Sequence, residues 1–299
     1  MTTPPPDPTR RTVIVAAVAG AAGFVARAVS AAAADPSAAG KDPAPMPQPV
    51  TPLAAPSPSS SSRPSPEFYE LRAYRLRRGP MPGRLDAYLK GALIPAAARA
   101  GCGPVGAFTV TLGPQSPSVY VLIPHPSADA FAAFAGKLAA DAAYQKVAEP
   151  FHALPPTDPP FAGLEVKLMR AFGGVPRLEV PPAAATGGPR LFELRTYRSH
   201  GDPAARKKVE MFDAAGEVAI FRRLGLTPVF FASDLTGEGL PSLTYMLTYP
   251  DMVAREKAWA AFRADPEWAK LRTTPGYTDA EIVTGIDNQV LAPTAYSQV

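Results

Sequence analysis

The sequence predicts an α+β fold in which two tandem ferredoxin-like βαββαβ units form an intrachain α/β barrel. Three observations predict this fold. The strand-like segment 68–75 recurs as segment 191–198, at an offset of 123 residues. Hydrophobic periodicity gives each copy the order strand, helix, strand, strand, helix, strand. One such unit leaves one face of its four-stranded sheet bare, and a second copy in the same chain can cover that face.

The repeat continues beyond the first strand at an offset of 124 residues. Pro104-Val105 matches Pro228-Val229, Ser118 matches Ser242, Pro126 matches Pro250, and Asp141 and Tyr144 match Asp265 and Trp268. A one-residue shift within about 100 residues, with the element order kept, indicates an internal duplication.

Copy one is expected to contain strand 68–76, helix 81–100, strands 105–112 and 119–123, helix 128–140 and strand 164–172. Leu85, Leu89 and Leu93 recur at helical spacing, which places them on one buried face of the first helix. Gly101 ends that helix, and Ser127 is expected to cap the second one.

Copy two is expected to contain strand 191–198, helix 202–224, strands 229–235 and 243–249, helix 252–264 and strand 282–290. Asp202 is a predicted N-cap because Pro203 follows it at the position where helices tolerate proline. Gly225 is expected to end that helix.

The N-terminus predicts export. Adjacent Arg10 and Arg11 precede a mildly apolar run, 13–25, and small residues follow at 30–34. This resembles a twin-arginine export signal, although Val-Ile-Val stands where such signals usually read Phe-Leu-Lys. About 13 apolar residues rise only ~20 Å, too little for a ~30 Å hydrocarbon core. We therefore expect no stable membrane span after cleavage, and an exported, periplasmic or otherwise extracytoplasmic protein.

Composition sets further bounds. The chain has 299 residues and 38 prolines, many of them in segment 35–66, which has almost no large apolar side chain and is expected to be a disordered linker. The formal charge is +4, and the predicted signal accounts for two of these charges, so nucleic-acid binding is not expected. The single cysteine, Cys102, excludes an intramolecular disulfide.

These boundaries divide the chain into six parts. They are an export signal (1–34), a Pro/Ser/Ala-rich linker (35–66), a first domain (67–172), an interdomain linker (173–189), a second domain (190–292) and a C-terminal tail (293–299).

The repeated strand resembles a known family. It reads Tyr69-Glu70-Leu71-Arg72-Ala73-Tyr74 in copy one and Phe192-Glu193-Leu194-Arg195-Thr196-Tyr197 in copy two, and Asp-Pro-Glu-Trp follows at 265–268. These motifs resemble the NIPSNAP family over residues 67–292, although copy one departs at 141–144, which reads Asp-Ala-Ala-Tyr. The resemblance implies a pair of dimeric α/β-barrel domains and no agreed catalytic residue set. The wider superfamily includes haem-binding proteins and cofactor-free monooxygenases, but a shared fold does not establish a function.

Strand alternation separates the motif into two faces. The apolar set with Leu71 and Leu194 is expected to pack under the helices. The candidate site residues then face the barrel interior, and they are Glu70, Arg72, Tyr74, Glu193, Arg195 and Tyr197. One interpretation is a polar pocket in which arginine anchors an anion or carbonyl and tyrosine donates a proton. The favoured interpretation is structural, with the Glu–Arg pairs satisfying each other across the two copies and fixing their register.

Other reactive side chains are isolated in the sequence. His125, His152 and His200 lack partners at metal-ligand spacing, so no metal site is predicted. His200 is a secondary candidate because it lies at a strand end near a helix start. No cofactor is predicted, and haem held by one histidine is the alternative. Cys102 is expected to be a small turn residue rather than a reactive thiol.

These observations favour an exported, non-catalytic module that binds a small molecule or a protein partner. The alternatives are a barrel-superfamily enzyme resembling the cofactor-free monooxygenases, or a haem-binding protein, each using the pocket between the copies. A homo-oligomer is compatible with the pattern. No Walker, Gly-x-Ser-x-Gly or His-Glu-x-x-His motif occurs in the sequence, so it lacks these familiar catalytic signatures.

Overall fold

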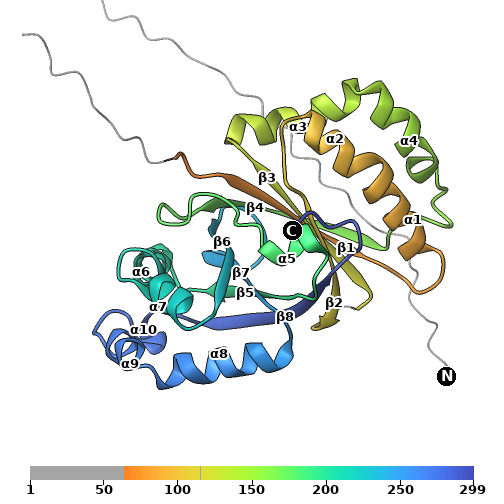
Figure 1. Ribbon diagram of the computed structural model, residues 1–299. Coiled ribbons are helices and arrows are strands. Elements are labelled where there is room, and N and C mark those ends of the chain that lie inside the picture. The colour runs from red at the N-terminus through yellow and green to blue at the C-terminus, as the bar shows by residue number, and fades with distance from the viewer. Residues whose placement is uncertain (1–63, 115) are drawn as a thin grey trace, which may run out of the picture. The chain divides into compact units, whose positions relative to one another are not determined.

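The computed structural model describes residues 64–114 and 116–299, and the predicted signal and nearly all of the predicted linker 35–66 lie outside this part of the chain. Copy one contributes β1 (Phe68–Arg75), β2 (Gly106–Leu112), β3 (Ser118–His125) and β4 (Gly163–Ala171). Copy two contributes β5 (Leu191–Arg198), β6 (Thr227–Asp234), β7 (Ser242–Tyr249) and β8 (Gly285–Pro293). The strands form one closed barrel in the order β1-β3-β2-β8-β5-β7-β6-β4 (Figure 1). The predicted fold is therefore confirmed.

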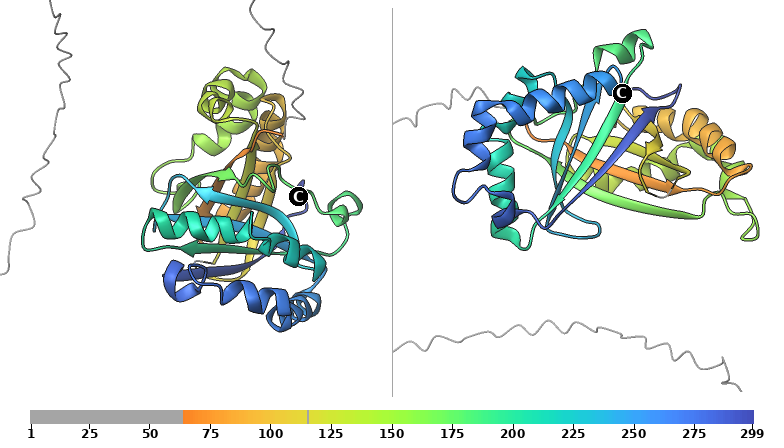
Figure 2. Two further views of the ribbon diagram at one scale, coloured as in Figure 1. Left: turned by 90° about the vertical axis from the view of Figure 1, so that its left-hand side faces the viewer. Right: turned by 90° about the horizontal axis from the view of Figure 1, so that it is seen from below.

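The helices lie outside the barrel. Copy one has α1 (Met81–Tyr88), η1 (Leu89–Leu93), α2 (Ile94–Arg99), α3 (Ala128–Ala140) and α4 (Ala142–His152). Copy two has α6 (Asp202–Phe212), α7 (Glu217–Arg223), α8 (Met252–Ala264), α9 (Pro266–Arg272) and α10 (Asp279–Ile282), and α5 (Pro182–Thr186) lies between the copies. Figure 2 shows the two helix groups on different sides of the strands. In the described part of the chain, no helix combines the length and apolarity needed to cross a bilayer.

The two copies are joined by two antiparallel strand pairs, β2–β8 and β4–β6. Each copy alone has the strand order of one open sheet, with the last strand beside the first. Inside the barrel, an apolar cluster draws on both copies, including Leu71, Phe108, Phe192, Leu194 and Met246. Separate clusters fill the space between the sheet and the helices of each copy. Both faces of most strands are thus covered, which is why the two copies fold into one body.

The first helix of each copy is interrupted, whereas one continuous helix was expected in each. In copy one, the π-helical turn η1 precedes Pro95, which has no N–H to continue the helical hydrogen bonding. In copy two, Gly216 has φ +95° and separates α6 from α7. Gly201, not Asp202, is the N-cap of α6, and Asp202 is its first residue. The Asp202 cap prediction was therefore wrong, while Ser127 caps α3 as expected by accepting a hydrogen bond from the Ala130 N–H.

The helices α4 and α9 were also not predicted, although the repeat contained their signal. Asp141 and Asp265 are the N-caps of these helices, each accepting hydrogen bonds from backbone N–H groups. Each aspartate also pairs with an arginine at the end of an earlier helix, Arg99 of α2 in copy one and Arg223 of α7 in copy two. The paired Asp141/Asp265 landmark therefore marks a helix start.

The last residues of the chain are not a free tail. Val299 is fully buried, and the Gln298 side chain accepts a hydrogen bond of 2.7 Å from the Val105 N–H. Segment 294–299 thus lies against copy one and covers one end of the barrel interior.

Candidate functional site

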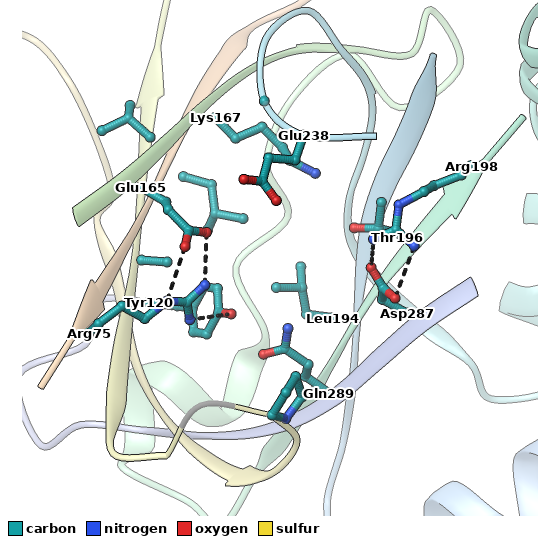
Figure 3. Close-up of a pocket in the computed structure, with 15 residues that line it drawn as sticks. Arg75, Tyr120, Glu165, Lys167, Leu194, Thr196, Arg198, Glu238, Asp287 and Gln289 are labelled. Atoms are coloured by element: carbon teal, nitrogen blue, oxygen red, sulfur yellow. Dashed lines mark hydrogen bonds and ion pairs between the residues drawn. The ribbon is translucent and has the colours of Figure 1, made fainter. Parts of the chain in front are cut away.

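A pocket of about 390 Å³ lies at one end of the barrel and is lined by both copies (Figure 3). Its lining comprises Leu71, Ala73, Arg75, Pro114, Tyr120, Glu165, Val166, Lys167, Leu194, Thr196, Arg198, Gly237, Glu238, Asp287 and Gln289. The apolar members continue into the cluster that fills the other end of the barrel. The result is an apolar floor under a polar rim.

The pocket exists because two strands extend beyond their partners in the other copy. β6 pairs with β4 only at residues 169–171, and β2 pairs with β8 only at residues 290–293. The preceding halves of β4 and β8 pair on one side alone, with β1 and β5. The barrel is therefore less tightly closed at this end, and side chains that would otherwise be covered line a cavity.

Two ion pairs related by the repeat form the rim of the pocket. Arg75 pairs with Glu165 at 2.8 Å, and Arg198 pairs with Asp287. Arg75 also donates to the Tyr120 hydroxyl at 3.3 Å. Because both carboxylates are about half exposed, these pairs contribute little to stability. Their main effect is on the charge of the pocket, because each rim arginine is neutralised by its carboxylate partner.

A third cation lies deeper and belongs to a buried polar network. Lys167 Nζ donates to Asp234 at 2.9 Å and to Thr244 at 3.1 Å. The Asp234 side chain is fully buried, and Ser242 and Thr244 donate to the same carboxylate oxygen at 2.6 and 3.0 Å. The Thr196 hydroxyl, which lines the pocket, lies 2.9 Å from the Thr244 hydroxyl. This network fixes the position of the Lys167 ammonium at the pocket wall.

The loop between β6 and β7 covers one side of the pocket and depends on two glycines. At Gly237 (φ +123°), a Cβ would lie 3.3 Å from the stem of Lys167. At Gly239 (φ +70°), a Cβ would lie 2.5 Å from Arg198 Nε. Positive φ favours glycine at both positions, and at Gly239 a Cβ would also displace the Arg198 side chain. The loop can therefore pack directly on the two cations.

The six candidate residues predicted to face the barrel interior lie on the opposite side of the sheet, and that part of the prediction was wrong. Tyr74 belongs to the cluster under the helices of copy one, and Tyr197 belongs to the corresponding cluster of copy two. Leu71 and Leu194 face the interior instead. The expected pairing across the copies is also wrong, because Glu70 bonds Arg72, Glu193 bonds Arg195, and each pair lies within one copy. Arg72 and Arg195 in turn donate to Tyr74 and Tyr197.

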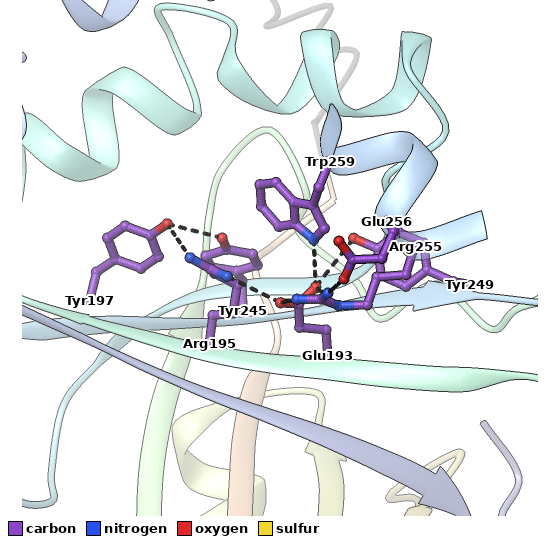
Figure 4. Close-up of polar contacts among 8 residues, drawn as sticks. All are labelled: Glu193, Arg195, Tyr197, Tyr245, Tyr249, Arg255, Glu256 and Trp259. Atoms are coloured by element: carbon purple, nitrogen blue, oxygen red, sulfur yellow. Dashed lines mark hydrogen bonds and ion pairs between the residues drawn. The ribbon is translucent and has the colours of Figure 1, made fainter. Parts of the chain in front are cut away.

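In copy two, Glu193 is the centre of a buried polar cluster (Figure 4). Arg255 donates to it at 2.5 and 3.0 Å, and the Trp259 indole N–H donates at 2.7 Å. Arg195 donates at 3.1 Å and stacks over the Trp259 ring at 4.8 Å. Burial by itself would raise the pKa of Glu193, but the hydrogen bonds from Arg255 and Trp259 hold it below its usual value. The cluster connects β5 to α8 and contributes no residue to the pocket lining.

In copy one, the corresponding cluster contains a buried Cys–His–Glu chain. The two ring nitrogens of His125 lie 3.3 Å from Cys102 Sγ and 3.0 Å from Glu70 Oε2. Burial opposes ionisation of Glu70, but the His125 hydrogen bond and the Arg72 charge hold its pKa below the usual value. An ionised Glu70 can only accept, so His125 Nε2 donates the hydrogen bond to it.

This arrangement resembles a nucleophile–base–acid order but lacks the conditions for reactivity. Burial raises the pKa of the Cys102 thiol, which opposes thiolate formation. Neither Cys102 nor His125 lines the pocket. Cys102 therefore fits the expected role of a small buried turn residue.

The remaining histidines do not form a site. His152 lies 3.1 Å from the Tyr144 hydroxyl, and His200, the secondary candidate, is exposed. Neither lines the pocket, and within residues 64–114 and 116–299 no cluster of His, Cys, Asp and Glu could hold a metal ion. The pocket therefore lacks the histidine ligand that the haem alternative requires.

The pocket residues could have been found from the sequence by one change of interpretation. Arg75 and Arg198 end the repeated motif and share the strand face of Leu71 and Leu194. Placing that face inside the barrel brings both arginines to its mouth. Lys167 and Asp234 are different, because no local pattern indicates that two residues 67 positions apart in the sequence would form a pair.

Comparisons with known proteins agree with this architecture. The NIPSNAP family model matches residues 69–157 and 192–298, one segment in each copy. A comparison with curated proteins finds no match. Among solved structures, a “putative monooxygenase” from Lactobacillus acidophilus is 10% identical, with a TM-score of 0.53, over 77% of this chain and 94% of its own.

Two smaller solved structures match about one copy each. A NIPSNAP-like domain protein from Burkholderia xenovorans is 21% identical over 36% of this chain and 88% of its own, with a TM-score of 0.33. A NIPSNAP family protein from Agrobacterium tumefaciens is 18% identical over 36% of this chain and 96% of its own, with a TM-score of 0.32. At these identities, the similarities concern the fold alone.

Proposed function

This chain belongs to the NIPSNAP family, and within that family we propose that it is a small-molecule-binding protein whose ligand occupies the pocket between the two copies. One observation carries the proposal: the pocket is built by both halves of the duplication and has a polar rim over an apolar floor. Its volume of about 390 Å³ lies within the range of known ligand sites. Duplication within one chain makes such a pocket permanent.

Binding without catalysis is the form of this function that the pocket supports best. Its described lining contains hydroxyl groups from Tyr120 and Thr196 but neither histidine nor cysteine, and so no Ser–His or Cys–His type of nucleophile–base pair. The similarity to the Lactobacillus protein is one of fold at 10% identity and brings no reaction to this chain. We therefore place the enzyme and haem alternatives second.

A filled pocket is expected to abolish ligand binding without unfolding the protein. Ala73 is 5% exposed and lines the pocket, so Ala73→Phe projects a ring into existing space. The neutral fluorescent probe N-phenyl-1-naphthylamine should bind the full wild-type chain, and Ala73→Phe should weaken this binding at least about tenfold, because the ring occupies the probe's volume. Fluorescence titration measures the affinity of the probe for each of the two proteins.

The matched control is Val253→Phe, because Val253 is 78% exposed on α8 and lies outside the pocket lining. It adds the same ring elsewhere and should leave the affinity unchanged. Equal binding by all three proteins would show that the probe binds outside the pocket, and the proposal would then be abandoned.

We also propose that the protein is exported by the twin-arginine route, on the sequence of segment 1–34 alone. Replacing Arg10 and Arg11 together by lysine should leave the uncleaved precursor in the cytoplasm, because this route reads the arginine pair. Cell fractionation and immunoblotting measure the distribution. Arg27→Lys keeps the pair intact and serves as the control, and export of the double variant at the wild-type rate would contradict the route.

A further inference from the structure

We propose that the pocket selects an uncharged amphipathic ligand, an apolar body with a hydroxyl group at one end, and that this end is held at Lys167. The inference rests on the proposed function and specifies its ligand class. It depends on three properties of the pocket: its charge balance, the asymmetry between its two halves, and the hydrogen-bonding groups left without partners.

The charges in the pocket are balanced. The lining contains three cations, Arg75, Lys167 and Arg198, and three carboxylates, Glu165, Glu238 and Asp287. The buried Asp234 behind Lys167 adds one more negative charge. An anionic ligand would therefore enter a site whose cations are already paired, and it would lose hydration without gaining a free counter-charge. This argues against carboxylate and phosphate ligands.

Glu238 strengthens this argument. Figure 3 shows its carboxylate directed toward the pocket, near Lys167. Among the described residues it has no ion-pair partner, unlike the two rim carboxylates. It would repel an anion approaching the Lys167 end and would leave an uncharged group unaffected.

The duplication shows that the pocket has a polar and an apolar half. Lys167, Asp234, Thr244 and Thr196 form one half, and the repeat places Gln289, Val110, Tyr120 and Ala73 at the corresponding positions of the other. A symmetric barrel would serve a symmetric ligand. Here one half offers a positioned ammonium and hydroxyl groups, and the other offers an aromatic ring and small apolar groups, so an amphipathic ligand has one favourable orientation.

Unsatisfied groups indicate which polar group the ligand carries. Asp234 and Thr244 engage two of the three hydrogens of the Lys167 ammonium, so one remains for an acceptor. Gln289 lines the opposite wall, and its buried Oε1 has no hydrogen-bond partner. In either orientation of that amide, one polar atom lacks a partner. A hydroxyl group both accepts and donates, so it suits the Lys167 end, and a second polar group on the body can satisfy Gln289.

The test compares three ligands with the same ring system by displacement of N-phenyl-1-naphthylamine from the full chain at pH 7. We expect 1-naphthol to bind at least about tenfold more tightly than 1-naphthoate, with naphthalene between them. The double variant Lys167→Gln with Asp234→Val installs the residues that the repeat already uses in the other half. This variant should bind 1-naphthol about tenfold more weakly than the wild type does, and its affinity for naphthalene should be unchanged.

Each outcome decides the inference. If 1-naphthoate binds as tightly as 1-naphthol while Ala73→Phe still abolishes probe binding, the pocket binds ligands but the ligand class is wrong. If the double variant weakens naphthalene and 1-naphthol equally, Lys167 does not anchor the hydroxyl and the inference is overturned. If no ligand displaces the probe, both the inference and the proposed function fail.

Discussion

Replacement of Glu193 by glutamine is expected to lower the free energy of unfolding by about 3–5 kcal/mol. Glu193 is fully buried and is the counter-charge for both Arg195 and Arg255. The amide keeps the shape of the side chain but leaves Arg195 without a carboxylate and leaves Arg255 with only the exposed Glu256, and the Trp259 N–H loses a charged acceptor. Urea unfolding followed by circular dichroism measures the loss.

Two matched substitutions calibrate this result. Glu70→Gln changes the repeat-related residue, which compensates a single guanidinium, Arg72, and should cost less, about 2 kcal/mol. Glu256→Gln changes a neighbouring carboxylate on α8 that is 61% exposed and should have almost no effect. A loss at Glu193 no larger than at Glu256 would mean that the cluster does not stabilise the fold.

The sequence alone did not show which face of each repeated strand lies inside the barrel. Alternation correctly separated Leu71 and Leu194 from Glu70 and Glu193, but it could not say which set lies inside. Both sides of these strands are covered, one by the barrel interior and the other by helices, so hydrophobicity does not distinguish them. Tertiary contacts determine which face lies inside the barrel. The α8 helix brings Arg255 and Trp259 to Glu193, and no local sequence pattern indicates that contact.

The fold, in contrast, was predictable from the sequence. Because of the duplication, each element predicted in one copy could be checked against its counterpart in the other. The uncovered face of one four-stranded sheet also required a second sheet to cover it. The α3 and α8 helices begin and end at the predicted residues. The pocket was only partly predictable, because it depends on β4 and β8 extending past their partners, and strand register between the copies is not encoded in one strand alone.

Copy two carries a buried ion pair where copy one is apolar. Lys208 lies 3.5 Å from Glu217, and both side chains are almost completely buried. Lys208 stands 123 residues after Leu85, and Glu217 corresponds to the buried segment of Leu93 and Ile94. The ammonium also lies within 6 Å of the rings of Tyr197, Phe212 and Trp268 and 3.8 Å from the exposed Asp279.

This pair is expected to make the protein less stable as the pH rises from about 4.5 to about 7. Burial raises the pKa of Glu217 to about 7, and Lys208 only partly opposes this effect. In that pH window the unfolded chain has lost the proton and the folded chain keeps it, so raising the pH favours unfolding. At about 1.4 kcal/mol for each pH unit, the loss over this window is at most about 3.5 kcal/mol. Urea unfolding at several pH values measures it.

Other buried carboxylates act in a different pH range, so the effect of Glu217 can be isolated. The pKa values of Glu70 and Glu193 lie below their usual values, because hydrogen bonds and charges from His125, Arg72, Arg255 and Trp259 outweigh burial. Their contribution is present above about pH 4.5 and is lost as the pH falls further. Stability should therefore be greatest near pH 4.5–5 and decline on both sides.

The repeat supplies the decisive variant. The double variant Lys208→Leu with Glu217→Leu places apolar side chains where copy one already has them. It should raise the free energy of unfolding at pH 7 by about 1–4 kcal/mol. It should also remove the decline between pH 4.5 and 7. Lys208→Leu alone should instead destabilise the protein at pH 7, because it leaves the Glu217 carboxyl buried without its cation. If the double variant declines with pH as steeply as the wild type, another group is responsible, and copy two keeps its charged pair for a reason unrelated to the titration of Glu217.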